Sequence, residues 1–155
     1  MSNNNSENEE FVVFRILEQE FCVEMGSTKE LRGWGPATPI PNSADYLVGI
    51  INLRGTILPI LDLASRLGFS PSERSNRHVV IVVLHEDKQF GLLVDAVSDI
   101  ILVAPENIRP VPKLHTEIAE EFFKHVIVQD ERIICQILLG QLLPELDAVL
   151  EQIAA

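Results

Sequence analysis

The chain has 155 residues, a mass of 17.3 kDa and a formal net charge of −11, and 46% of its residues are hydrophobic. A chain of this length buries about two thirds of the surface that its unfolded form exposes, so it needs neither a metal nor a disulfide for stability. Its acidity, with no cluster of Lys and Arg, excludes nucleic acid and anionic lipid as main partners. No apolar run reaches the ~18 residues of a membrane span, so we expect no direct membrane insertion.

The first ten residues, MSNNNSENEE, are polar and acidic. They contain neither a basic nor an apolar region, so we expect a disordered tail over residues 1–10, no signal peptide, and a cytoplasmic protein. The two cysteines, Cys22 and Cys135, lie in apolar segments far apart in the sequence. In a cytoplasmic protein this favours free thiols that pack like small hydrophobic residues.

The first half of the chain reads as short β-strands. Residues 11–17 and 20–25 are apolar runs separated by a polar pair, which predicts an opening β-hairpin. Residues 36–41 contain three prolines and predict an extended loop. A short helix is expected over residues 63–67, ending at Gly68.

The densest pattern lies between Gly49 and Leu63, where two apolar runs flank the sequence NLRG. It predicts a second hairpin with Arg54 and Gly55 at its tip, since glycine accepts the positive φ of a tight turn. Pro59 cannot donate a hydrogen bond, so we expect its strand to lie at a sheet edge or to carry a bulge. Arg54 then points outward, where it can meet a partner protein.

The second half repeats the first after a polar linker at residues 70–77. A hairpin over residues 78–94 matches the opening hairpin, a proline segment at 110–112 matches residues 39–41 about 70 residues earlier, and residues 126–139 match the Arg54 hairpin. We infer two copies of one five-strand unit, each a small barrel or half-sandwich. Helices are expected in an insertion at residues 117–123 and, as an amphipathic C-terminal helix, at residues 144–155.

Groups suited to catalysis do not converge in the sequence. The four histidines show no metal-ligand spacing with each other or with the cysteines, and we expect no cofactor and no metal. Asp62, Asp95 and Asp99 could form a carboxylate site, which leaves a small carboxylate-based enzyme as a remote alternative. The sequence therefore favours a binding module over an enzyme.

Three stretches then carry a specific resemblance: Glu30-Leu31-Arg32-Gly33, the proline segment up to Pro41, and Gly49 to Gly55 followed by Pro59, Asp62 and Leu63. Together they resemble the CheW-like coupling (adaptor) proteins of bacterial chemotaxis. The similarity continues with weaker matches through the second half and covers residues 11–143. The NLRG stretch is its most specific part.

This resemblance implies a mainly all-β fold of two pseudo-symmetric SH3-like five-stranded β-barrel subdomains that share a hydrophobic core, with short helices. The approximate subdomains are 11–69 and 78–143, and exchange of strands between them stays open. The implied function is that of a non-catalytic adaptor, recruited to membrane-associated receptor arrays, that joins the cytoplasmic tip of chemoreceptors to the regulatory domain of a CheA-type histidine kinase. The implied receptor-binding residues are Glu30, Leu31, Arg32, Gly49, Arg54 and Gly55.

Two alternatives remain within the resemblance. The adaptor could serve a pilus-motility or other non-flagellar chemosensory pathway, or it could act as a decoy that competes for kinase or receptor. The chain also departs from the family at Gly26-Ser27-Thr28, where family members usually carry large aliphatic residues. This change removes apolar surface from the expected receptor side.

Overall fold

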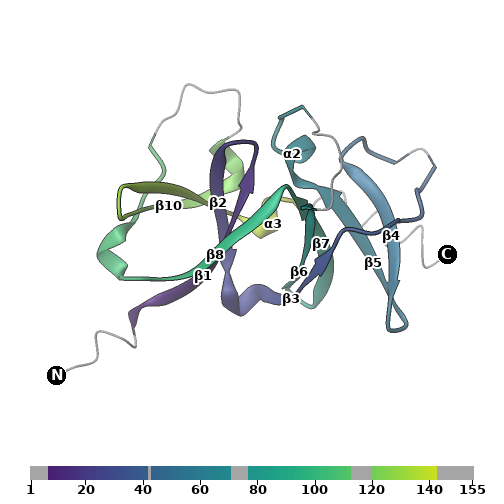
Figure 1. The fold of residues 1–155 in the computed structure, drawn as a ribbon, viewed down its shortest axis with the longest axis horizontal. Helices are drawn as coiled ribbons and strands as arrows, with labels where there is room; N and C mark the ends of the chain where they lie inside the picture. Colours follow the sequence, from purple (N-terminus) through teal and green to yellow (C-terminus); the bar gives the residue numbers. More distant parts are fainter. Residues whose placement is uncertain (1–6, 42, 71–76, 113–119, 143–155) are drawn as a thin grey trace.

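The computed structural model describes residues 7–41, 43–70, 77–112 and 120–142 (Figure 1). Within these residues almost all regular structure is β-strand, with two one-turn α-helices and three short 3₁₀ turns, η1–η3. In chain order the elements are β1 (Glu9–Ile16), β2 (Gln19–Glu24), η1 (Met25–Ser27), β3 (Thr28–Gly33), β4 (Leu47–Leu53), β5 (Thr56–Asp62), α2 (Leu63–Arg66), β6 (Val79–His85), β7 (Lys88–Val94), β8 (Ala96–Val103), η2 (Pro105–Asn107), β9 (Ile108–Arg109), η3 (Glu120–Phe122), β10 (Phe123–Gln129), β11 (Arg132–Ile137) and α3 (Leu139–Leu142).

The strands form two sheets that lie side by side in Figure 1. The six-stranded sheet has the order β8-β1-β2-β11-β10-β9, and the five-stranded sheet has the order β3-β6-β7-β5-β4. We call the curved units that they build the six-stranded barrel and the five-stranded barrel. The predicted fold class, two SH3-like β subdomains with short helices, is confirmed.

The two sheets follow one plan. The order β8-β1-β2-β11-β10 corresponds strand by strand to β3-β6-β7-β5-β4. Each sheet has one parallel pair, β2 with β11 and β5 with β7. Beyond β10 lies β9, and beyond β4 the matching place is taken by Thr38, which forms a bridge with Ile50. Each barrel therefore combines the opening hairpin of one half of the chain with the later strands of the other half.

The strands β1, β2, β5, β6 and β7 bury residues of both faces, which explains why they read as continuous apolar runs. On β1, Val12, Phe14 and Ile16 face a large core between the sheets, while Phe11 and Val13 face the interior of the six-stranded barrel. A third core, with Leu58 and Val80 among its members, fills the five-stranded barrel. The shared hydrophobic core of the predicted fold is thus present, flanked by one small core inside each barrel.

Arg66 links the two barrels beside this shared core. Its guanidinium lies 4.7 Å from the centre of the Tyr46 ring and 4.6 Å from that of Phe122, and its Nη2 donates to the carbonyl oxygen of Gln141 at 3.1 Å. Stacking on two aromatic rings suits the planar, weakly hydrated guanidinium. Arg66 closes α2 of one barrel onto the η3 and α3 region of the other.

Three hairpins close with two-residue turns in which both residues have positive φ. The turns are Arg54-Gly55, Glu86-Asp87 and Asp130-Glu131, with φ between 48° and 88°. This geometry matches the right-handed twist of the flanking strands. The three hairpins predicted at these places are confirmed by the strand pairing of β4 with β5, β6 with β7 and β10 with β11.

Some boundaries differ from expectation. Glu9 and Glu10 belong to β1, not to a tail, because their backbones pair with β8. Pro59 was expected at a sheet edge or at a bulge. The edge is wrong, since β5 lies between β4 and β7, and the nearby register shift lies on β4, between Leu47 and Gly49. Pairing of β5 with β7 begins only at Ile60, so β7 needs no hydrogen bond from Pro59. Residues 120–122 form η3 and Phe123 begins β10. The remaining insertion and the C-terminal helix at 144–155 lie outside the described residues.

Candidate functional site

Charged residues from the two edges of the five-stranded barrel meet at its rim. Glu30 and Arg32 lie on the edge strand β3, and Arg54 lies at the tip of the β4–β5 hairpin. The Nη2 of Arg54 donates to Oε1 of Glu30, and Nη1 of Arg32 lies 3.5 Å from Oε2 of the same carboxylate. The structure thus brings together three residues that the sequence predicts for the site.

The cluster is open to solvent and stays charged. The Arg54 side chain is 71% exposed and that of Glu30 29%. The hydrogen bond from Arg54, helped by the positive charges of Arg54 and Arg32, holds the pKa of Glu30 below its ordinary value of 4.5. At neutral pH Glu30 is therefore a carboxylate shared between two guanidinium groups.

A groove of about 510 Å³ opens beside this cluster. One wall consists of the end of β3 and the segment that follows it, and the other consists of β4. Ile60 and Val80 also line the groove, and both belong to the core of the five-stranded barrel. Leu31 and Ile57 are large apolar residues that stay 42% and 40% exposed in this barrel. The lining residues are Arg32, Gly33, Trp34, Gly35, Pro36, Thr38, Ile50, Ile51, Asn52, Ile57, Ile60 and Val80.

The two predicted glycines shape the backbone of this site. Gly49 has a φ of +155°, and a Cβ there would lie 2.4 Å from the carbonyl oxygen of Thr38, so only glycine lets the proline segment pass this close to β4. Gly55 has a φ of +88° in the hairpin turn, where its N–H donates to Oδ1 of Asn52 at 2.9 Å. The turn that presents Arg54 is therefore internally braced.

The sequence is matched over residues 10–147 by the model of the CheW-like domain family. The chain belongs to the CheW-like family. It is 46% identical over 144 residues to a probable chemotaxis protein CheW of Rhizobium etli, covering 93% of each chain, and 43% identical over 135 residues to chemotaxis protein CheW of Rhizobium meliloti, covering 87% of each. The crystal structure of the scaffolding protein TtCheW from Thermoanaerobacter tengcongensis matches with a TM-score of 0.83 at 31% identity, covering 88% of this chain and 92% of that one.

The other barrel of this CheW-like chain carries a second arginine cluster that the sequence analysis did not predict. Arg132 on β11 donates two hydrogen bonds to Glu20 on β2, at 3.0 and 2.7 Å, and two to Asp99 on β8, at 3.1 and 3.0 Å. The hydrogen bonds to Glu20 raise the pKa of Arg132 most, and those to Asp99 add to the effect. A signal was available, because Arg132 directly follows the turn that matches Arg54-Gly55.

The three carboxylates of the enzyme alternative each have a separate structural partner. Asp62 caps α2 by accepting from the backbone N–H of Ser65 at 3.3 Å. Asp95 accepts from the N–H of Leu17 at 2.7 Å, and Asp99 is bound by Arg132. In the part of the chain that the structure describes, no group of three His, Cys, Asp or Glu side chains could hold a metal ion.

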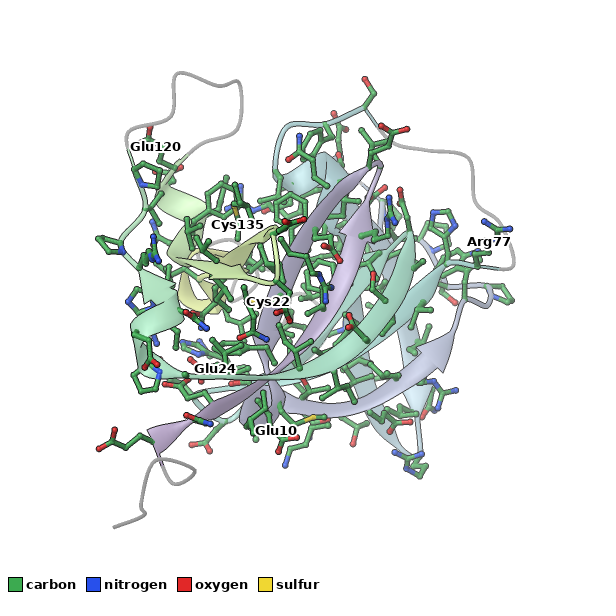
Figure 2. The ribbon with its side chains drawn as sticks, turned by 60° about the vertical axis from the view of Figure 1, so that its left-hand side comes forward. Glu10, Cys22, Glu24, Arg77, Glu120 and Cys135 are labelled. Atoms are coloured by element: carbon green, nitrogen blue, oxygen red, sulfur yellow. The ribbon has the colours of Figure 1, made fainter. Side chains whose placement is uncertain are left out.

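The two cysteines are free and lie on neighbouring strands, Cys22 on β2 and Cys135 on β11 (Figure 2). Cys22 packs in the core of the six-stranded barrel, whereas Cys135 packs against the shared core, so the two side chains serve different cores. Burial raises the pKa of both thiols, most strongly that of Cys22. Among the described helices, none is long and apolar enough to cross a membrane.

Proposed function

We propose that this CheW-like protein is a non-catalytic cytoplasmic adaptor that couples the cytoplasmic tip of chemoreceptors to the regulatory domain of a CheA-type histidine kinase. Membership of the family supports this function, as do the relatives named chemotaxis protein CheW and the scaffolding protein TtCheW. The protein would be recruited to receptor arrays by its partners, because no membrane-binding feature of its own is needed for that role.

The observation that carries the proposal is the groove beside the Glu30–Arg54 cluster. Apolar residues such as Ile51, Ile57 and Ile60 line it, and charged or polar residues such as Arg32 and Asn52 stand with them. An apolar centre with a polar rim is the usual composition of a protein-binding surface. Its composition therefore suits a protein segment, such as a receptor tip.

Kinase autophosphorylation tests the proposal directly. Receptor cytoplasmic domains, CheA-type kinase and ATP are mixed with and without the protein, and labelled kinase is measured over time. We expect phosphorylation to come under receptor control only when the protein is present. A protein that binds receptor and kinase yet only suppresses phosphorylation would be the competing decoy, and binding to neither partner would refute the adaptor function.

A matched pair of variants locates the receptor surface. Ile57 and Ile133 are both the second residue of the strand that follows the turn, one in each barrel, and both are exposed. Ile57→Asp places a charge in the groove, and we expect it to abolish receptor binding, while Ile133→Asp keeps it. Equal loss in both variants would show that the groove does not determine receptor binding.

A further inference from the structure

Two aromatic residues take equivalent places in the two barrels. β4 and β5 correspond to β10 and β11, and both hairpins carry a register shift directly after the pair at their open end. Tyr46 precedes β4 and Phe122 precedes β10. The carbonyl oxygen of each accepts a backbone hydrogen bond of 2.7 Å, from Asp62 in one barrel and from Leu138 in the other. Tyr46 and Phe122 are therefore counterparts.

Arg66 lies between these two equivalent rings. Its guanidinium is 4.7 Å from the centre of the Tyr46 ring and 4.6 Å from that of Phe122. A point on the pseudo-two-fold axis that relates the barrels has equal distances to equivalent atoms, and the guanidinium meets this condition. Counted from the same paired residues, the counterpart of Arg66 is Leu142, which is buried in the shared core. Only one of the two copies can supply the group at the axis, and here it is the copy with Arg66.

The contacts of Arg66 are directional, unlike the apolar packing of the shared core. Hydrophobic burial is non-directional and sets no angle by itself. A planar guanidinium between two rings is held in its plane, and Nη2 of Arg66 also donates to the carbonyl oxygen of Gln141 on α3 at 3.1 Å. Among the described residues no acceptor meets the buried Nε of Arg66, which weakens the folded state. The residue is thus better suited to fixing a geometry than to maximising stability.

The strands that hold Arg66 also line the groove. Ile50 and Ile51 on β4, with Ile57 and Ile60 on β5, are among its lining residues. Tyr46 directly precedes β4, and α2 with Arg66 directly follows β5. The hairpin that carries the groove is therefore the element that Arg66 joins to η3 and α3 of the six-stranded barrel.

We propose that Arg66 is a positioning residue: held between Tyr46 and Phe122, it fixes the angle between the two barrels and thereby the geometry in which the adaptor holds receptor and kinase together. This inference rests on the proposed adaptor function for its signalling readout. Arg66 acts through the two rings and not through contact with a partner. Its removal should therefore spare the binding of each partner alone and impair the coupling between them.

Residual dipolar couplings of backbone amides measure the angle between the barrels in the free protein. We expect both barrels of the original protein to fit one alignment tensor. Arg66→Leu, which introduces the residue type of its counterpart, and Arg66→Lys, which keeps the charge without the plane, should each require two tensors. Arg132→Ala is the control and should keep one tensor, because both acids that Arg132 binds belong to its own barrel. A single tensor with the original orientation in the two Arg66 variants would overturn the positioning role.

Kinase control is then compared with binding. We expect Arg66→Leu to bind receptor domains and the kinase regulatory domain, each alone, as tightly as the original protein does, while receptor control of kinase phosphorylation falls about tenfold. Equal losses in separate binding and in coupling would show a merely structural role and overturn the proposal. If the original protein binds neither partner, the proposed adaptor function fails, while the dipolar couplings still decide whether Arg66 fixes the angle.

Discussion

Thr38 and Ile50 pair through their backbones directly beside Gly49, and this pairing joins the proline segment to the edge of β4. The N–H of Ile50 donates to the carbonyl oxygen of Thr38 at 2.8 Å, and the N–H of Thr38 donates back to Ile50 at 2.9 Å. Because a Cβ on Gly49 would lie 2.4 Å from that same carbonyl oxygen, the segment can pair with β4 only next to a glycine. One wall of the groove depends on this pairing, since Thr38 and Ile50 both line it.

Gly49→Ala should therefore disturb both stability and docking. The new methyl group meets backbone atoms that cannot move away singly, so we expect a loss of about 2 kcal/mol in the free energy of unfolding, measured by urea denaturation. Gly35→Ala is the control, because a Cβ at Gly35 meets nothing within 4 Å. A Gly49→Ala variant as stable as the control would contradict the close approach of the proline segment.

Removal of Arg132 should weaken the six-stranded barrel. Arg132→Ala leaves the carboxylates of Glu20 and Asp99 without the guanidinium that both of them share. These three side chains are partly exposed, so solvent screening limits the loss to about 1 kcal/mol in the free energy of unfolding. Addition of 1 M salt should shrink the difference between variant and original protein to about half or less. If the difference in the free energy of unfolding did not change with salt, Arg132 would act through packing of its aliphatic stem.

The titration of Glu30 should report its bond to Arg54. The depressed pKa means that the folded state gains from the ionised carboxylate above the ordinary value of 4.5, and that this gain is lost as the pH falls through the lower folded value. The ion pair between Glu30 and Arg54 is thus intact at neutral pH and breaks only in acid. In Arg54→Ala, NMR of the Glu30 side-chain carboxyl should show its pKa rising toward 4.5 while staying below it, because Arg32 remains. An unchanged pKa would contradict the hydrogen bond.

The thiols should be inert at neutral pH. Burial raises the pKa of Cys22 and Cys135 above the ordinary value of 9.0, so both are neutral in the folded protein. We expect slow reaction with a thiol reagent at pH 8, slower for Cys22 than for Cys135, and fast reaction of both in urea. Because only the unfolded thiols ionise just above pH 9, the free energy of unfolding should fall there. Rapid labelling of Cys22 in the folded protein would contradict its burial.

The hairpins could be predicted from the sequence because their signals are local. A polar pair between two apolar runs gives the turn, and the turn fixes the pairing of the strands on both sides. The strands β3 and β8 were not predicted. β3 reads Thr-Lys-Glu-Leu-Arg-Gly, whose charges resemble a loop, and it becomes a strand because β6 offers an edge with which it pairs. Such an effect of tertiary structure leaves little trace in the local pattern.

The membership of the candidate site could be predicted, but its geometry could not. The family motif indicated Glu30 and Arg54 as residues of one surface without indicating that they bind each other. That contact forms because the barrel curves until its first and last strands approach, which depends on the exchange of hairpins between the two halves. The need for glycine at position 49 could not be predicted for the same reason, since it depends on where the proline segment passes.

Co-sedimentation of the three partners tests the adaptor function most directly. Vesicles or assemblies that carry receptor cytoplasmic domains are mixed with the regulatory domain of a CheA-type kinase and pelleted, with and without this protein. We predict that the kinase domain pellets only when the protein is present, and that Ile57→Asp keeps it in the supernatant. Kinase that pellets equally well without the protein, or that stays in the supernatant with it, would contradict the account.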